Sequence, residues 1–360
     1  MRALAIDIGT GTQDILLWDT ADPVANAIQL VMPSPTARVA KLVRSATERG
    51  QSIALSGTIM GGGPCHWAVA DHRKAGYPVW ATAQAARTFN DDLAMVQEEM
   101  GIEIVGDEEI AGLPAEPITM RDLDLDAVAA ACAAFGVELA YDVIAVAVFD
   151  HGNAPPEMSD RRFRFDYLTT RLADGGWLTD LGFERDAIPS EMTRLAAVAA
   201  TAPDNIALVV MDTAPAAILG ALDDPRLQTE DELVVANIGN FHALAFHLAG
   251  HTIRGLFEHH TGELTPSQLI RLIERLAAGE ITNDEVFNSQ GHGALLLDPA
   301  PTPQPFLATT GPRQAMLTSV ALPYHAVPHG AMMQAGCFGL LRAVAAHMPD
   351  FREQIEAGLS

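Results

Sequence analysis

The order of apolar and polar positions along the chain predicts an α/β protein. Apolar runs at residues 3–8, 15–18 and 27–32 are separated by turn residues, so the chain is expected to begin as a meander of strands. Helical spacing and strand-like runs then alternate, as in α/β folds. The helices expected in this part are 36–49, 82–100 and 124–135, and the expected strands are 52–55 and 143–149.

A second set of alternating elements begins near residue 206. Segment 153–178 lies before it and has charged and proline residues without clear periodicity, so it is expected to be a loop or insertion. A chain of 360 residues is longer than the about 250–300 residues at which single cores stop growing. We therefore expect two lobes, 1–205 and 206–360. The elements expected after the boundary are strands 206–211, 233–237, 243–248 and 306–309 and helices 215–221, 266–278 and 330–347.

Charge and cysteine content narrow the class of protein. The net charge of −24 repels phosphate backbones and anionic lipid, so neither nucleic acid nor a membrane surface is expected as a partner. The most apolar stretch, 206–222, is interrupted by Asp212 and Pro215 and is better explained by a strand and a helix than by a membrane span. Three widely separated cysteines and no signal-peptide pattern predict a cytoplasmic protein.

The stretch AIDIGTGTQDILLWD at residues 5–19 carries the first candidate chemistry. It has a G-x-G but Asp14 replaces the third glycine of a dinucleotide fingerprint, and a strand-like run follows where a Rossmann unit needs a helix. A tight hairpin remains, in which the amides and hydroxyls of Gly9, Thr10, Gly11 and Thr12 hold phosphate. Asp7 would then act with a magnesium ion. A plain glycine turn is the alternative.

Later segments resemble, in order, the superfamily of actin, heat-shock chaperones, sugar kinases and hexokinase. VVMDTAPAAILGAL and VVANIGNFHALAFHL (209–222 and 234–248) are similar to its second strand–helix unit and second phosphate hairpin. FLATTGPRQAML (306–317) is similar to its adenosine motif, and PHGAMMQAGCFGLL (328–341) to its closing helix. The resemblance implies a two-lobed actin-like, ribonuclease H-like α/β fold with mixed sheets flanked by helices.

DIGTGTQD, FDHGNAP, FEHHTG and PHGAMM also resemble stretches of an uncharacterised bacterial family, a domain of unknown function. Some of its members carry the label pyruvate formate-lyase activating enzyme. Activases of that kind hold an iron–sulfur cluster with a closely spaced cysteine triad. Cys65, Cys132 and Cys337 do not form such a triad, so these residues do not support the label.

The superfamily resemblance implies ATP and Mg²⁺ as cofactors and a kinase or ATPase reaction. Gly239 and Asn240 would hold phosphates from the second hairpin, Gly311 would lie near the adenosine, and Asp212 or His151 would orient the acceptor. Asp212 is equally suited to cap the helix that follows it. The acceptor, a small molecule or a protein, is not identified by the sequence, and a homodimer is left open.

Two other functions remain as alternatives. The second hairpin has the neutral Asn237 where the superfamily usually has Asp, which favours a nucleotide-gated sensor or assembly protein without turnover. His259, His260 and His292 suggest a metal-dependent enzyme, although adjacent histidines on a strand point to opposite sides. Three nearby arginines, Arg161, Arg162 and Arg164, either hold an anionic ligand or form salt bridges on a surface loop.

Overall fold

The fold contains two six-stranded sheets in which five strands follow the same order. The computed structural model describes residues 1–155, 157–302 and 304–359. In the first sheet, β1, β2 and β3 form an antiparallel meander, while β8 and β10 run parallel to β1. The order is β3 (Ile28–Pro33), β2 (Thr12–Asp19), β1 (Arg2–Ile8), β8 (Val143–Val148), β10 (Ala207–Asp212) and β9 (Gly182–Glu184).

The second sheet repeats the five-stranded part around its own hairpin, and its sixth strand lies on the opposite edge. Strands β11, β12 and β13 form an antiparallel meander, and β15 and β16 continue the sheet in parallel with β11. The order is β14 (Gly293–Leu296), β13 (Thr252–His260), β12 (His242–Ala249), β11 (Glu232–Ile238), β15 (Phe306–Thr310) and β16 (Tyr324–His325). The repeated order confirms the expected two-lobed actin-like α/β fold.

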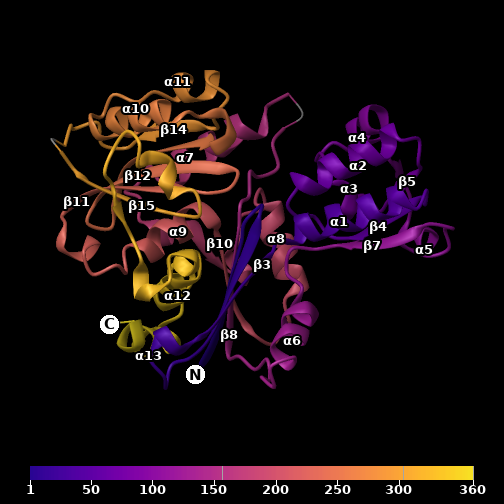
Figure 1. The fold of residues 1–360 in the computed structure, drawn as a ribbon, viewed down its shortest axis with the longest axis horizontal. Coiled ribbons are helices and arrows are strands. Elements are labelled where there is room, and N and C mark those ends of the chain that lie inside the picture. Colours follow the sequence, from indigo (N-terminus) through magenta and orange to yellow (C-terminus); the bar gives the residue numbers. More distant parts are fainter. Residues whose placement is uncertain (156, 303, 360) are drawn as a thin grey trace.

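Two helices with small residues join the lobes. α9 (Thr213–Ala221) and α12 (Ala335–His347) pack together in a core to which both sheets contribute (Figure 1). A Cβ on Gly220 would stand 1.7 Å from the Ala335 carbonyl oxygen, and one on Gly339 would stand 1.9 Å from that of Ala216. Only glycine permits so close an approach of the two backbones. The lobes are therefore coupled through direct backbone contact.

The strand at 207–212 belongs to the first sheet, whereas the expected boundary at residue 205 made it the opening strand of the second lobe. β10 pairs in parallel with β8 along its whole length and completes the first sheet. α12 also returns from the end of the chain to contact β1, β8 and β10. The first lobe therefore contains elements from both sides of residue 205, because strands that are neighbours in a sheet can be distant from each other in sequence.

A smaller subdomain is inserted between β3 and β8 and projects to the right in Figure 1. Its parallel sheet has the order β6-β5-β4-β7, and its helices enclose a hydrophobic core of their own. Its elements are α1 (Pro35–Glu48), β4 (Ile53–Gly57), α2 (Pro64–Lys74), β5 (Val79–Ala81), α3 (Ala83–Ala86), α4 (Leu93–Met100), β6 (Glu103–Ile104), α5 (Asp107–Ile110) and β7 (Glu116–Met120).

The remaining helices cover the sheets, and one of them corrects an expectation. Segment 153–178 was expected to be a loop or insertion, but it contains α7 (Asp160–Arg171), capped by the Ser159 side chain. The periodicity is obscured because its buried face includes Arg164 together with Phe165 and Leu168. The others are α6 (Leu125–Ala133), α8 (Thr193–Thr201), α10 (Pro266–Ala277), α11 (Asn283–Asn288) and α13 (Pro349–Leu359). None of the helices described is long and apolar enough to cross a membrane.

Candidate functional site

The turns of the two hairpins face each other across a small cavity between the lobes. Each is closed by the same backbone bond: the Gly9 N–H donates to the Thr12 carbonyl at 2.9 Å, and the Gly239 N–H to the His242 carbonyl at 2.8 Å. Within the cavity, of about 100 Å³, the structure brings together most of the predicted phosphate-binding residues. These are Gly9, Thr10, Gly11, Thr12, Gly239 and Asn240.

Close approaches to the second hairpin explain two of the glycines. A Cβ on Gly11 would stand 2.6 Å from Asn240 Nδ2, so a larger residue there would push against the opposite turn. Gly311, the predicted adenosine-side residue, has a φ of +93° and would place a Cβ 2.3 Å from Asn237 Oδ1. Gly311 lies behind the second hairpin, and the next residue, Pro312, lines the small cavity.

Two buried carboxylates lie opposite each other on the first hairpin. Asp7 pairs with Asp14 across β1 and β2, and both line the small cavity. Burial raises the pKa of Asp7 to about 7, an increase opposed by the hydrogen bond that the Thr213 hydroxyl donates to it. Burial, with the nearby charge of Asp7, raises the pKa of Asp14 to about 8. Asp14 Oδ1 is buried and has no hydrogen-bond partner within the described part of the chain, so this pair fits the oxygen ligands that Mg²⁺ prefers.

Asp212 has a different role from the two carboxylates of the hairpin. Its oxygens accept hydrogen bonds from the Ala214 N–H at 2.9 Å and the Asp150 N–H at 3.2 Å. The guanidinium of Arg164 adds two more at 2.8 and 3.1 Å. Asp212 caps α9 and is not among the residues that line either cavity beside the hairpins. It therefore holds Arg164 in position through an ion pair at 2.8 Å.

Arg164 is the centre of a buried ion-pair network. It is 4% exposed and donates to both oxygens of Glu258 at 2.6 Å, in addition to Asp212 and the Asp150 carbonyl at 2.7 Å. The guanidinium also lies over the Phe149 ring at 4.1 Å. The expected arginine cluster on a surface loop is therefore corrected for Arg164, which lies in the interior and joins the ends of β8, β10 and β13.

A larger cavity of about 330 Å³ adjoins the small one on the side of the inserted subdomain. The two share the wall formed by Gly9, Thr10, Phe149, Phe241 and His242. The glycine cluster after β4 and the turn between α3 and α4 supply the far wall. His151, the predicted acceptor-side residue, faces this cavity together with Asp150. A ligand there would lie directly beside whatever occupies the space between the hairpins.

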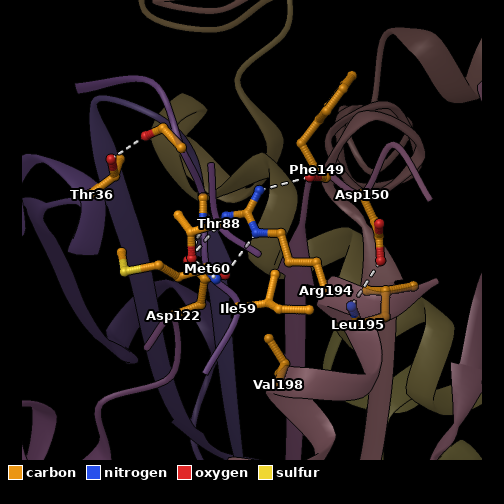
Figure 2. A network of polar contacts seen from close by, with 12 residues as sticks. Thr36, Ile59, Met60, Thr88, Asp122, Phe149, Asp150, Arg194, Leu195 and Val198 are labelled. Atoms are coloured by element: carbon orange, nitrogen blue, oxygen red, sulfur yellow. Dashed lines mark hydrogen bonds and ion pairs between the residues drawn. The ribbon is translucent and has the colours of Figure 1, made fainter. Parts of the chain in front are cut away.

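Figure 2 shows how Arg194 connects the inserted subdomain to the first sheet. Its guanidinium binds Asp122 at 2.7 and 3.0 Å and donates to the Phe149 carbonyl at 2.7 Å. Asp150 accepts the Leu195 N–H at 2.9 Å and the Gly152 N–H at 2.9 Å. Burial raises the pKa of Asp150, against the lowering effect of these two bonds. The wall of the larger cavity is thus held from both sides.

The histidines gather differently from the expected trio of His259, His260 and His292. His259 turns away, with its ring nitrogens 3.2 Å from Ser289 Oγ and 3.1 Å from the His260 carbonyl. His260 lies opposite His242 in the sheet register and faces the larger cavity. Among the described residues, the group with converging nitrogens is His151, His242 and His292. The alternation of adjacent strand residues was anticipated, but the partner supplied by the second hairpin was not.

Four further functional candidates were missed by sequence reasoning. Asp14 had been considered only as a departure from a glycine fingerprint, although its place seven residues after Asp7 puts it across a three-residue hairpin turn. Asp150 directly precedes the predicted His151, so the same position at the end of an apolar strand could have indicated it. Arg194 and Glu258 had no local signal, because their partners are distant along the chain.

Residues 60–316 match a family described as “Putative pyruvate format-lyase activating enzyme (DUF1786)”. No curated protein matches this chain. The solved structures similar to it include a ROK hexokinase from Thermus thermophilus, with 12% identity, 97% of this chain and 100% of that chain covered, and a TM-score of 0.31.

Two other similar structures are larger proteins. A Ppx/GppA phosphatase from Aquifex aeolicus has 11% identity and a TM-score of 0.22, with 78% of this chain and 64% of that chain covered. A ROK family transcriptional regulator, a homologue of the E. coli Mlc protein, has 8% identity and a TM-score of 0.24 over 70% of this chain. This chain spans 38% of that regulator.

Proposed function

This chain belongs to the DUF1786 family, and we propose that it is a phosphotransferase that moves a phosphoryl group from ATP to a small molecule. One observation carries the proposal: two matched hairpins, one from each sheet, bound a small cavity that shares a wall with a larger one. Phosphoryl transfer needs chiefly positioning and charge stabilisation. Adjoining spaces for a phosphate chain and an acceptor would supply the positioning.

The first hairpin supplies the groups suited to a phosphate and its cation. The amides and hydroxyls of residues 9–12, with Gly239 and Asn240 opposite, would hold phosphate oxygens. Asp7 and Asp14 would hold Mg²⁺, and the cation would offset the negative charge of the phosphates. In a protein with a net charge of −24, this local compensation is needed for an anionic nucleotide to bind.

The lobes must separate for ATP to enter. The space between the hairpins is about 100 Å³, well below the about 300–1,000 Å³ of pockets that enclose a whole small-molecule ligand. Trp67 of α2 lies against Phe241 of the second hairpin, with ring centroids 5.6 Å apart, at the edge of the larger cavity. Closure of this contact over bound substrates would exclude water, as lids do in other transferases.

Titration calorimetry with MgATP tests the proposal. We expect binding by the wild-type protein that needs Mg²⁺ and is weakened at least tenfold in Asp7→Asn, a change that keeps the side-chain size and removes its charge. Asp174→Asn removes the same charge from an exposed position and should bind as the wild type does. Absence of nucleotide binding by the wild-type protein would overturn the proposal.

Asn237 favours a second candidate, a nucleotide-gated sensor without turnover. Asn237 lines the small cavity, and its Oδ1 is buried with no hydrogen-bond partner in residues 1–155, 157–302 and 304–359. A neutral amide offers no charge to a cation, so the second hairpin is less suited to activate water or an acceptor. MgATP binding with no release of ADP over hours would support the sensor, whereas turnover that is lost in Asp7→Asn would reject it.

Iron–sulfur chemistry, which the family description suggests, does not fit the residues present. Cys65, Cys132 and Cys337 are buried on α2, α6 and α12, in three different parts of the fold. An iron–sulfur cluster needs thiolates that converge on one site. Burial raises the pKa of each of these thiols, which opposes thiolate formation. We therefore derive no reaction step through such a cluster.

A further inference from the structure

Three imidazoles from different parts of the chain meet at the inner wall of the larger cavity. His151 follows β8, His242 begins β12 directly after the second hairpin turn, and His292 immediately precedes β14. One nitrogen from each ring lies within 4.8 Å of the others. The ring centroid of His292 is 5.1 Å from that of His151 and 5.0 Å from that of His242. The fold therefore gathers three nitrogen donors at one point.

We propose that His151, His242 and His292 hold a divalent transition-metal ion, with zinc as the best match, at the wall of the larger cavity. Imidazole nitrogens suit zinc, and three histidines are a known ligand set for zinc with an open fourth position. This site is separate from the carboxylate pair of Asp7 and Asp14, whose oxygen atoms suit magnesium. It stands whether or not the chain binds ATP.

The buried state of His292 points to a ligand. His292 is 1% exposed, and neither of its ring nitrogens has a hydrogen-bond partner among the described residues. A buried polar group without a partner costs about 1–3 kcal/mol, so such groups are rare in native proteins. A metal ion bound to one nitrogen would remove this cost. Because three such rings converge, one ion would serve all of them.

Glu258 lies behind His292 in the position of a supporting carboxylate. Its Oε2 is 3.5 Å from His292 Nδ1, and the residue is fully buried. Histidines that bind metals usually donate their other ring N–H to a carboxylate, which fixes the ring and strengthens it as a ligand. Glu258 is itself fixed by two hydrogen bonds from Arg164. Glu258 therefore supports the orientation of His292, and Arg164 in turn holds Glu258 in place.

Charged side chains of both signs surround the three rings, with Arg161, Arg164 and Arg194 as the cations and Glu258 as the carboxylate. Arg164 carries one positive charge and is paired with the carboxylates of Asp212 and Glu258, which leaves one net negative charge in a buried network. Neutral imidazoles add no charge of their own and bind a metal through a ring-nitrogen lone pair.

The position of the rings indicates an open coordination site. His151 and His242 line the larger cavity, whereas His292 lies behind them. Phe149 stacks against His242 with ring centroids 4.3 Å apart and planes 6° apart, which restricts its rotation. Tetrahedral zinc–nitrogen bonds of about 2.0–2.1 Å place ligand nitrogens about 3.4 Å apart. The rings need to close by about 1.5 Å at most, and the bound ion would face the cavity.

Such an ion would act on an oxygen-bearing ligand in the larger cavity. An open zinc site polarises a carbonyl or lowers the pKa of a bound water or hydroxyl. The ligand class that suits the site is therefore a small molecule that presents a carbonyl, carboxylate or hydroxyl oxygen to the metal. His260, whose ring lies 4.7 Å from that of His292, borders the same space.

The test measures metal binding directly, with no activity assay. Chelator-treated full-length protein is titrated with Zn²⁺ by calorimetry, and separately with Co²⁺ while its visible absorption is recorded. We expect one tight equivalent of Zn²⁺ and the intense visible bands of Co²⁺ in a tetrahedral site. His151→Gln and His242→Gln should each weaken Zn²⁺ binding by more than about 10- to 100-fold, because the loss of a residue that only supports a ligand already costs that much.

Two control variants show whether the tight Zn²⁺ equivalent binds at these three histidines or elsewhere on the protein. His259→Gln removes a neighbouring imidazole whose nitrogens lie near Ser289 and the His260 carbonyl, so it should keep the tight equivalent. Asp7→Asn should keep it as well, because that carboxylate belongs to the first hairpin. Melting curves confirm that each variant is folded. The proposal is overturned if the wild-type protein binds no tight equivalent, or if folded His151→Gln and His242→Gln bind Zn²⁺ as His259→Gln does.

Discussion

Replacement of Arg164 by methionine tests whether the buried ion pairs hold the end of β8 to the second sheet. All five N–H groups of this arginine are used: two on Glu258, two on Asp212 and one on the Asp150 carbonyl. Methionine fills a similar volume without the charge. The variant therefore leaves two buried carboxylates, 0% and 8% exposed, without their common partner.

The expected cost follows from the burial of these charges. Removing one partner of a buried ion pair costs about 3–5 kcal/mol, because the remaining charge is uncompensated. The entropy of unfolding of a 360-residue chain is about 0.76 kcal/mol per degree, so this loss lowers the melting temperature by about 4–7 °C. We expect that decrease in calorimetric melting curves at pH 7.

The same helix provides a matched control. Arg162 is exposed on α7, with its guanidinium 5.3 Å from the centre of the Phe287 ring, and Arg162→Met should change stability by no more than about 0.5 kcal/mol. Adding Glu258→Gln to Arg164→Met removes one unpaired charge, so the pair should cost less than the sum of the single changes. If Arg164→Met melts within a degree of Arg162→Met, the buried ion pairs contribute little to stability and the expected cost is wrong.

Three further predictions concern other parts of the site. Burial raises the pKa of Asp14 to about 8, so the stability that its bound proton contributes is present below pH 4 and lost as pH rises through 8. Without divalent cations, Asp14→Asn should therefore raise the melting temperature at pH 8.5 more than at pH 5. The exposed control Asp174→Asn should show no such difference between the two pH values. Gly339→Ala should lower the free energy of unfolding in urea by about 1–3 kcal/mol or more, because its Cβ would meet Ala216 of α9, whereas Gly136→Ala has open space and tests only the effect of its positive φ. MgATP should change the fluorescence of Trp67 as the lobes move, and Trp67→Phe should abolish that change while the other three tryptophans remain.

The sequence predicted the parts of the site that lie within single hairpins. Residues 5–19 contain both strands and the turn, so the alternation of apolar residues and the glycines were sufficient to place Asp7 beside residues 9–12. The second hairpin was identified at 234–248 through the resemblance to the superfamily. In both, the pairing partner is only a few residues away, and the backbone bond that closes the turn is the same.

Parts that depend on distant pairing could not be predicted in this way. α7 was taken for a loop because a helix that buries an arginine has no clean apolar stripe, and Glu258, which explains that burial, is 94 residues away. The boundary expected at residue 205 does not match the structure, because β10 and the helix after it look in sequence like the start of a new unit. Only the pairing of β10 with β8 shows that it belongs to the first sheet. The histidine trio was drawn from sequence neighbours, whereas the sheet register sets His242 opposite His260.

The equal backbones of the two hairpins make their chemical difference informative. Asp7 and Asn237 both stand two residues before the first glycine of their turn, and Asp14 and Leu244 both stand five residues after it. Asp7 faces Asp14 in the register of the first sheet, and Asn237 faces Leu244 in that of the second. The first hairpin therefore presents two carboxylates where the second presents an amide and a leucine. Thr12 and His242 are equivalent too. Positive charge is therefore best held at the first hairpin, while the second contributes a neutral wall and the imidazole that borders the larger cavity. This asymmetry supports a cation-bound phosphate chain on one side and an acceptor on the other.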